Sequence, residues 1–152
     1  QYHNKVPFVK MLMSGVTTRL NEKDSSGSIR SILGRKCRFD LWEPTTFAMH
    51  KALSYRDAIK EHGDTTRLRR AYTYKALNRL IQASAADMTK QSMVNIYETG
   101  KVPLIQIHDE IALSVKDLEE AKKYSTIMES SVPLVIPNKC DIEIGTSWGE
   151  SK

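Results

Sequence analysis

Residues 104–113 read Leu-Ile-Gln-Ile-His-Asp-Glu-Ile-Ala-Leu, and this stretch decides the fold of the chain. Apolar residues on both sides of the His-Asp-Glu triplet form two β-type runs, at 102–107 and 111–115. Both runs are short enough to be strands. Only residues 108–110 separate them, so the pattern predicts a β-hairpin whose tip carries an imidazole and two carboxylates.

The carboxylates of this tip are the strongest candidates for chemistry. Two acids between buried strands are costly unless water, a cation or hydrogen bonds compensate. Asp109 and Glu110 offer oxygen ligands, and Mg²⁺ binds through one or two protein carboxylates together with substrate phosphates. The same residues also fit an ordinary turn, because Asp tolerates turn geometry. No zinc-ligand spacing, phosphate-binding glycine loop or nucleophile elbow occurs in the 152 residues.

The flanking sequence predicts an α+β fold, in which helices pack on an antiparallel sheet. Helical spacing of apolar residues and turn residues at the boundaries predict helices at 7–20, 45–62, 68–97 and 117–130. Short β-type runs predict strands on both sides of Gly34 within 28–39 and a last strand at 140–144. Asp117 is expected to cap the last helix.

The long helix at 68–97 is expected to carry two stripes. The core-facing stripe is predicted to contain Leu77, Ile81, Ala85, Met88, Ser92 and Ile96. Lys75, Asn78 and Gln82 fall on a neighbouring stripe, spaced by three and four residues. The side-chain amides of Asn78 and Gln82 therefore point the same way. Gly100 is expected to end this helix.

The positive charge of the chain is concentrated in its first half. Residues 1–75 contain 15 Lys/Arg and 7 Asp/Glu, a balance of +8, whereas residues 76–152 contain 8 and 11, a balance of −3. A basic half is typical of a polyanion-binding surface, although many solvated surfaces are equally basic. No run approaches the roughly 18 apolar residues of a membrane helix.

Residues 1–5 contain neither an initiator Met nor the apolar core of a signal peptide. We therefore expect a piece of a longer protein or a processed chain. Cys37 and Cys140 lie far apart and without metal-ligand spacing. They are expected to be reduced thiols of a cytosolic protein.

Four segments, in order along the chain, resemble the motifs of family A (DNA polymerase I type) DNA polymerases. Residues 106–110, Q-I-H-D-E, resemble the family's third catalytic motif, Q-V-H-D-E. Residues 78–90, N-R-L-I-Q-A-S-A-A-D-M-T-K, resemble its N-x-x-x-Q-G-[ST]-A-A-D-x-x-K helix. Residues 27–36, G-S-I-R-S-I-L-G-R-K, resemble its G-x-[IV]-R-T-L-x-G-R-R segment. Trp148 fits the terminal G-x-x-W, and the central helix looks most like that of bacteriophage replicative members.

The resemblance implies a palm-type antiparallel sheet built around the central hairpin, with about residues 1–26 ending the fingers and residues 27–152 in the palm. By this resemblance Asp109 would bind the catalytic Mg²⁺ ions. Glu110 would support the metal site, and His108 would approach the primer terminus; His108 also fits a packed histidine whose ring is satisfied by backbone.

The resemblance also implies contacts with template–primer DNA. Asn78 and Gln82 would face the minor groove, where hydrogen-bond acceptors occur at every base pair and amides can test pairing without reading sequence. Phosphate contacts would come from the cations of the glycine-rich segment, namely Arg30, Arg35, Lys36 and Arg38. Ala83 replaces the usual Gly, and Tyr74 stands where many members carry Arg. Whether Lys75 supplies that missing polar contact stays open.

Two family motifs do not occur in these 152 residues: the D-[YF]-S-x-x-E-x-R motif with the second metal-binding aspartate, and the fingers helix R-x-x-x-K-x-x-x-[FY]-G. We therefore expect a polymerase component that is inactive without an upstream segment or subunit, which would complete the two-Mg²⁺ site. Its other partners would be template–primer DNA and deoxynucleoside triphosphates, with no membrane. Its location would be the cytoplasm, that of a bacterial host if a phage encodes it.

Two alternatives remain open from the sequence. The basic half and the amide stripe would suffice for a non-catalytic module that binds duplex DNA. A stand-alone metal-dependent phosphoesterase built on His108, Asp109 and Glu110 is the weakest alternative, because no second set of metal ligands accompanies them.

Overall fold

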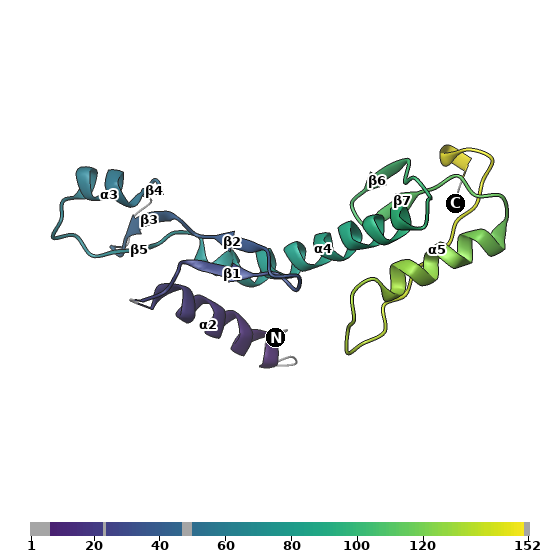
Figure 1. Cartoon of the computed structure of the whole chain (residues 1–152). Coiled ribbons are helices and arrows are strands. Elements are labelled where there is room, and N and C mark those ends of the chain that lie inside the picture. Colours follow the sequence, from purple (N-terminus) through teal and green to yellow (C-terminus); the bar gives the residue numbers. More distant parts are fainter. Residues whose placement is uncertain (1–6, 23, 47–49, 151–152) are drawn as a thin grey trace. The chain divides into compact units, whose positions relative to one another are not determined.

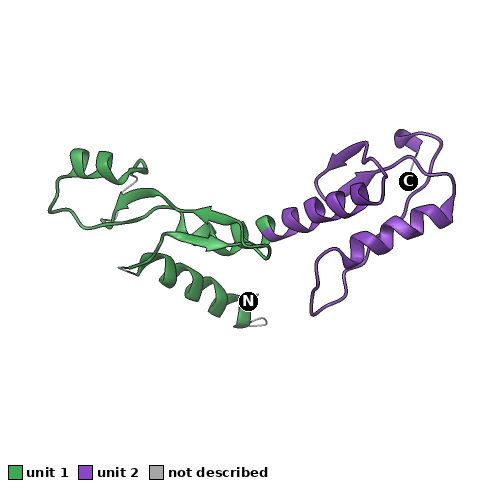
Figure 2. Ribbon diagram, viewed as in Figure 1, with its two compact units in different colours: residues 1–83 green, residues 84–152 purple. Residues whose placement is uncertain are grey.

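The computed structural model describes residues 7–22, 24–46 and 50–150 (Figure 1). The chain divides into two compact units, residues 1–83 and 84–152 (Figure 2). The α+β class is confirmed, and the described strands pair antiparallel in three small sheets of two, three and two strands. The prediction of no signal peptide concerned residues 1–5, which lie outside the described residues.

Unit 1 combines a basic hairpin, a three-stranded sheet and short helices. In chain order its elements are α2 (Pro7–Asn21), β1 (Ser28–Arg30), β2 (Lys36–Arg38), β3 (Leu41–Pro44), β4 (Leu53–Ser54), α3 (Tyr55–His62), β5 (Leu68–Arg70) and η1 (Thr73–Lys75). Strands β1 and β2 form the predicted strand–turn–strand, with Ile29 opposite Cys37. Strand β3 lies at the centre of the second sheet, between β4 and β5.

A small apolar core holds the hairpin of unit 1 against α2. Leu20, Phe39 and Ala76 are buried there, and Val16 and Ile29 pack against them. Burying a side chain such as Leu20, which is 1% exposed, stabilises the fold by about 1.5–3 kcal/mol. The helix predicted from Pro7 is confirmed, and α2 runs beside this hairpin (Figure 1). Val16 and Leu20 of α2 pack into the core, whereas Phe8 and Met11 are exposed.

The guanidinium of Arg70 joins β5 to the loop that precedes β1. It donates hydrogen bonds to the backbone carbonyls of Phe39, at 2.9 Å, and Ser25, at 3.3 Å. It also stacks over the ring of Trp42, with 4.5 Å between Cζ and the ring centroid. Gly27, at φ +63°, passes so close that an added Cβ would lie 2.3 Å from Arg70 Cζ. This approach explains why a glycine begins the segment at 27–36.

Unit 2 carries the predicted β-hairpin. Helix α4 (Ala76–Glu98) begins in unit 1 and continues into unit 2, where it is followed by β6 (Ile105–Ile107), β7 (Glu110–Ala112), α5 (Leu118–Ser130) and η2 (Trp148–Glu150). The hairpin is confirmed, since β6 and β7 pair antiparallel. Gly100, at φ +87°, follows the end of α4 as expected. Asp117 caps α5 by accepting a 2.8 Å hydrogen bond from the backbone N–H of Glu120.

Two helix predictions began too early. Residues 68–70 are strand β5 rather than helix, because they pair with β3, and Tyr72 then adopts a left-handed conformation at φ 60°. Within the stretch 45–62, helix α3 starts only at Tyr55 because Ser54 forms its N-cap. Residues 47–49 lie outside the described part of that stretch.

The last strand and half of the core-facing stripe were also predicted wrongly. Residues 140–144 form no strand; the backbone N–H of Cys140 instead donates to the Glu129 carboxylate at 3.0 Å. On α4, Ile81 is 59% exposed, whereas the buried positions after Ala76 are Asp87, Thr89, Ser92 and Ile96. The predicted core-facing stripe is therefore buried only near the C-terminal end of α4. The spacing of the apolar residues did not show which face of the helix the rest of the chain covers.

Cys37 and Cys140 are both half-buried and are not joined by a disulfide. Across the described residues, no helix is long and apolar enough to cross a membrane.

One carboxylate in unit 2 has a strongly shifted pKa. The Glu120 carboxylate accepts a 2.8 Å ion-paired hydrogen bond from Lys101 Nζ and a 2.7 Å bond from the backbone N–H of Lys116. The Lys101 bond first, and then the Lys116 bond, lower the pKa of Glu120 from 4.5 to about 2. These bonds connect the segment after α4 to the first turn of α5.

We expect the contribution of Glu120 to stability to depend on pH. Its folded pKa lies below the unfolded value, so the contribution is complete above pH 4.5 and is lost as pH falls toward 2. Thermal melting of the full chain and of Glu120→Gln should therefore differ at pH 7 and converge near pH 2. Glu119→Gln, which removes an exposed i,i+3 pair with Lys122, should behave like wild type. An equal difference at both pH values would contradict the assignment.

The close approach of Arg70 to Gly27 gives a second prediction. Gly27→Ala should destabilise unit 1 by about 1–3 kcal/mol from the left-handed backbone alone, and further because the guanidinium must move. Gly34→Ala is the matched control, since Gly34 has φ +85° in the same hairpin and nothing within 4 Å of an added Cβ. Urea unfolding compares the two variants. Equal losses of stability would mean that Arg70 moves aside without cost.

Candidate functional site

The tip of the β6–β7 hairpin is a two-residue turn. Ile107 and Glu110 are the last paired residues, so His108 and Asp109 form the turn between them. His108 has φ 53°, a left-handed conformation that glycine usually supplies at the first position of such turns. A non-glycine residue there costs about 1–3 kcal/mol, and such strain clusters at functional sites. The side chains of His108, Asp109 and Glu110 are all exposed.

Two side-chain contacts hold the turn in place. The Gln106 amide donates a 2.5 Å hydrogen bond to the backbone carbonyl of His108. The indole Nε1 of Trp148 donates a 3.0 Å hydrogen bond to a carboxylate oxygen of Glu110. The sequence marked Trp148 only through its resemblance to a terminal motif. Its partner, 38 positions away in the chain, was not predictable from local sequence.

The surroundings of the turn differ from the expectation in one respect. We predicted acids between two buried strands, but Ile105 and Ile107 of β6 are 43% and 38% exposed. The desolvation cost inferred for the two carboxylates therefore does not apply to the chain as described. What remains is the chemistry of the donors: exposed carboxylate oxygens suit Mg²⁺, which retains water and substrate oxygens among its ligands.

The residues fit part of a metal site. Among residues 7–22, 24–46 and 50–150, no group of three or more His, Cys, Asp or Glu side chains could hold a metal ion. Asp109 and Glu110 can supply one or two oxygen ligands, the number that Mg²⁺ uses when substrate phosphates complete its shell. Further ligands have to come from substrate, water or other residues.

The β1–β2 hairpin in unit 1 has one cationic face and one apolar face. Arg30 and Lys36 are directly opposite in the register, and Arg38 follows on the same exposed side. The other side carries Ile29 and Cys37, both half-buried. Like charges facing each other across two strands are destabilising unless a counter-charge is present. This face of the hairpin would therefore be more stable with a polyanion bound to it than without one.

The remaining predicted site residues of unit 1 lie on or near α4. Arg35 donates a 2.8 Å hydrogen bond to the backbone carbonyl of Ala83, which ties the tip of the basic hairpin to this helix. Asn78 and Gln82, four residues apart on α4, are both exposed. Lys75 lies in η1, with its ammonium over the rings of Tyr72 and Tyr74 at 5.3 and 5.6 Å.

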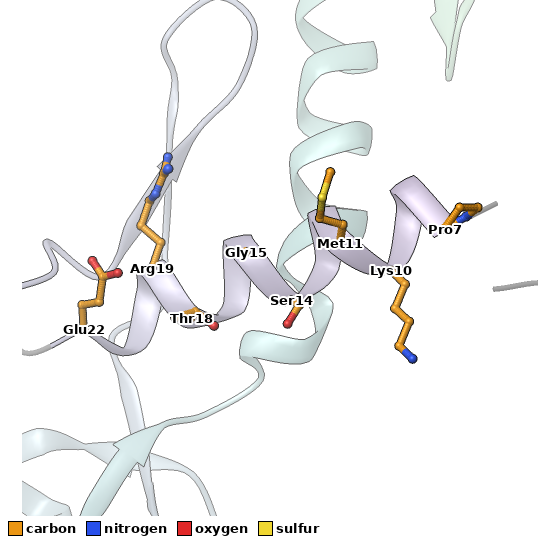
Figure 3. A pocket seen from close by; sticks show the side chains of 8 residues that line it. All are labelled: Pro7, Lys10, Met11, Ser14, Gly15, Thr18, Arg19 and Glu22. Atoms are coloured by element: carbon orange, nitrogen blue, oxygen red, sulfur yellow. The ribbon is translucent and has the colours of Figure 1, made fainter. Parts of the chain in front are cut away.

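The site residues predicted from the sequence thus form two sets. His108, Asp109 and Glu110 lie together on one turn of unit 2, and the cations and amides lie in unit 1. A shallow groove of about 690 Å³ also runs along one face of α2 and contains none of them (Figure 3). Its lining residues come from α2 and Glu22, the residue that follows this helix.

Comparison with known proteins identifies the family. Residues 1–150 match the family described as DNA polymerase family A. The chain is 38% identical over 150 residues to a DNA-directed DNA polymerase of Pseudomonas phage M6, covering 99% of this chain and 19% of that protein. This chain therefore belongs to the family A DNA polymerases.

Cellular members of the family match over shorter stretches. DNA polymerase I of Borreliella burgdorferi is 36% identical over 108 residues, 64% of this chain and 12% of that protein. A thermostable DNA polymerase I of Thermus filiformis is 35% identical over 92 residues, 56% of this chain and 11% of that protein. The chain thus spans no more than about a fifth of the length of these relatives. No solved structure matches it significantly.

The bond between Trp148 and Glu110 gives a structural prediction. Trp148→Phe keeps an aromatic ring but removes the indole N–H, so the bond to Glu110 is lost. Amide hydrogen exchange in the full chain should accelerate by roughly 2- to 12-fold at residues 146–150 and around Glu110, because a hydrogen bond contributes about 0.5–1.5 kcal/mol. Trp42→Phe, in unit 1, is the control and should leave this exchange unchanged. Unaltered exchange in Trp148→Phe would show that the bond does not hold these segments.

Proposed function

We propose that this chain forms part of the nucleotidyl-transfer site of a DNA-directed DNA polymerase, with Asp109 as a ligand of the catalytic Mg²⁺. One observation carries the proposal: in a chain of this family, the two-residue turn exposes Asp109 at the tip of the hairpin that resembles the family's catalytic motif. The left-handed backbone of His108 supports it, because strain of this kind is typical of active sites.

Each residue of the turn would have its own role. Asp109 presents its carboxylate to the metal, which when bound would neutralise phosphate charge and activate the primer hydroxyl. Glu110, held by the Trp148 indole, would act as a supporting group beside it. His108 would lie near the primer terminus. In the family's terms, about residues 1–26 would end the fingers and residues 27–152 would belong to the palm.

The residues of unit 1 would bind template–primer DNA. The cationic face formed by Arg30 and Lys36, together with Arg35, suits phosphates, a contact that is salt-sensitive and independent of sequence. Asn78 and Gln82, exposed on the same helix, suit the minor groove, whose acceptors occur at every base pair. Lys75 is the remaining candidate for a polar contact with the DNA.

The proposed site needs residues that these 152 do not supply. Two metal ions about 3.5–4 Å apart require bridging ligands, and one aspartate does not fix both. The second aspartate and the cations that hold the triphosphate would come from the family's remaining motifs. Alone, the chain would not extend a primer; with those motifs, its substrates would be template–primer DNA and deoxynucleoside triphosphates.

The test uses a chimera in which this chain replaces the matching 150 residues of the Pseudomonas phage M6 relative. The chimera should extend a primer with Mg²⁺, and Asp109→Ala should lower the rate at least about 1,000-fold, equivalent to about 4 kcal/mol. Asp141→Ala, at another exposed aspartate of unit 2, is the matched control and should retain the rate. Circular dichroism checks that both variants fold.

Two outcomes would reject parts of the proposal. Full activity of Asp109→Ala would remove the metal assignment. A folded chimera that binds primer–template in a salt-dependent way but never extends it would favour the alternative, a non-catalytic module that binds duplex DNA. The charge of the β1–β2 hairpin is the observation in favour of that alternative.

A further inference from the structure

A second candidate site lies in unit 1, away from the basic hairpin face. It is a cleft of about 640 Å³ with walls from the end of α2 and from β3, α3 and β5. Two aromatic side chains, Trp42 and Tyr55, and three arginines, Arg67, Arg69 and Arg70, line it. Neither the sequence motifs nor the proposed function accounts for this combination.

The two aromatic side chains of the cleft contact each other. The rings of Trp42 and Tyr55 meet edge to face, with centroids 5.0 Å apart and planes at 65°. Arg70 stacks on Trp42 and is itself fixed by the carbonyls of Phe39 and Ser25. Tyr55 is nevertheless 55% exposed. Trp42 thus supports the ring of Tyr55, and the open surface of that ring offers a stacking platform for a flat partner.

The arginines give the cleft a positive character. Its lining contains three arginines against the two carboxylates of Glu22 and Asp64. Arg67 is exposed. The Arg69 side chain, 57% exposed, pairs with Glu43 at 2.9 Å, and surface pairs of this kind contribute little to stability. In the β3–β5 register Arg69 lies opposite Glu43 and Arg70 lies opposite Trp42, so the Arg69 side chain points to the other face of the sheet from Trp42.

We propose that this cleft binds unpaired nucleotides of single-stranded DNA. One base would stack on Tyr55, which Trp42 supports, and an adjacent phosphate would contact Arg67. Stacking on an aromatic platform beside cations is how proteins bind single strands without sequence preference. Duplex DNA fits less well, because its bases already stack on each other. The assignment of the bound strand as polymerase template rests on the proposed function. The binding of single-stranded DNA to the cleft does not.

The experiment measures binding to the full chain in a Trp148→Phe background, where Trp42 is the sole tryptophan. Titration with a ten-nucleotide oligothymidylate should quench Trp42 fluorescence to saturation. Tyr55→Ala should weaken binding by about 5- to 150-fold, the effect of losing one base–aromatic stack, whereas Tyr55→Phe, which keeps the ring, should bind like wild type. Arg67→Ala should lower the salt dependence by about 0.7 in slope, as expected for one phosphate contact on a single strand.

Several results would overturn the proposal. These are the absence of saturable quenching, an unchanged affinity in Tyr55→Ala, and quenching of Trp42 by blunt duplex DNA or heparin at equal affinity. Equal affinity for duplex DNA or heparin would mean that the cleft binds polyanions in general. Oligouridylate binding as tightly as oligothymidylate would support the stacking site and show that it does not distinguish RNA from DNA. Because no synthesis is measured, failure of the Asp109 test leaves this result unaffected.

Discussion

A single carboxylate, that of Glu120, holds both ends of the segment that carries the candidate metal-binding turn. One of its oxygens accepts from Lys101 Nζ and the other from the backbone N–H of Lys116, and these two residues flank the β6–β7 hairpin in the sequence. The same carboxylate lies in the first turn of α5, where negative charge interacts favourably with the helix dipole. The two ends of the hairpin segment are therefore held together by Glu120. This contact restricts the position of the turn even though β6 is exposed.

Arg70 plays the equivalent part in unit 1. Its guanidinium contacts the backbone and so loses part of its water shell. Hydrogen bonds to two backbone carbonyls and stacking on the face of Trp42 offset this loss. One side of the guanidinium fixes the loop at Gly27 from which the basic hairpin starts, and the other fixes the aromatic pair of the cleft. A change at Arg70 would therefore disturb both surfaces, so it cannot by itself report on either one.

Local signals predicted much of the fold, and non-local contacts account for the errors. The hairpin at the His-Asp-Glu triplet and the cap at Asp117 depend on neighbours in sequence, and both were predicted correctly. Strand β5 was taken for helix because only its pairing with β3, about 26 residues earlier, makes it extended. The triplet was found as a candidate site from its own residues. The bond from Trp148 to Glu110 was missed because no spacing rule connects them.

The register of the hairpin decides how the two adjacent acids differ. Glu110 pairs with Ile107 in the ladder, and its carboxylate already accepts the Trp148 indole. Asp109 lies in the turn, and within the described part of the chain no hydrogen bond or ion pair engages its carboxylate. A cation could bind Asp109 without breaking an existing contact, whereas full coordination by Glu110 would compete with the indole. A shift of the register by one residue would turn the side chains of one strand to the opposite face, so the pairing of Ile107 with Glu110 keeps Glu110 in the ladder and Asp109 in the turn.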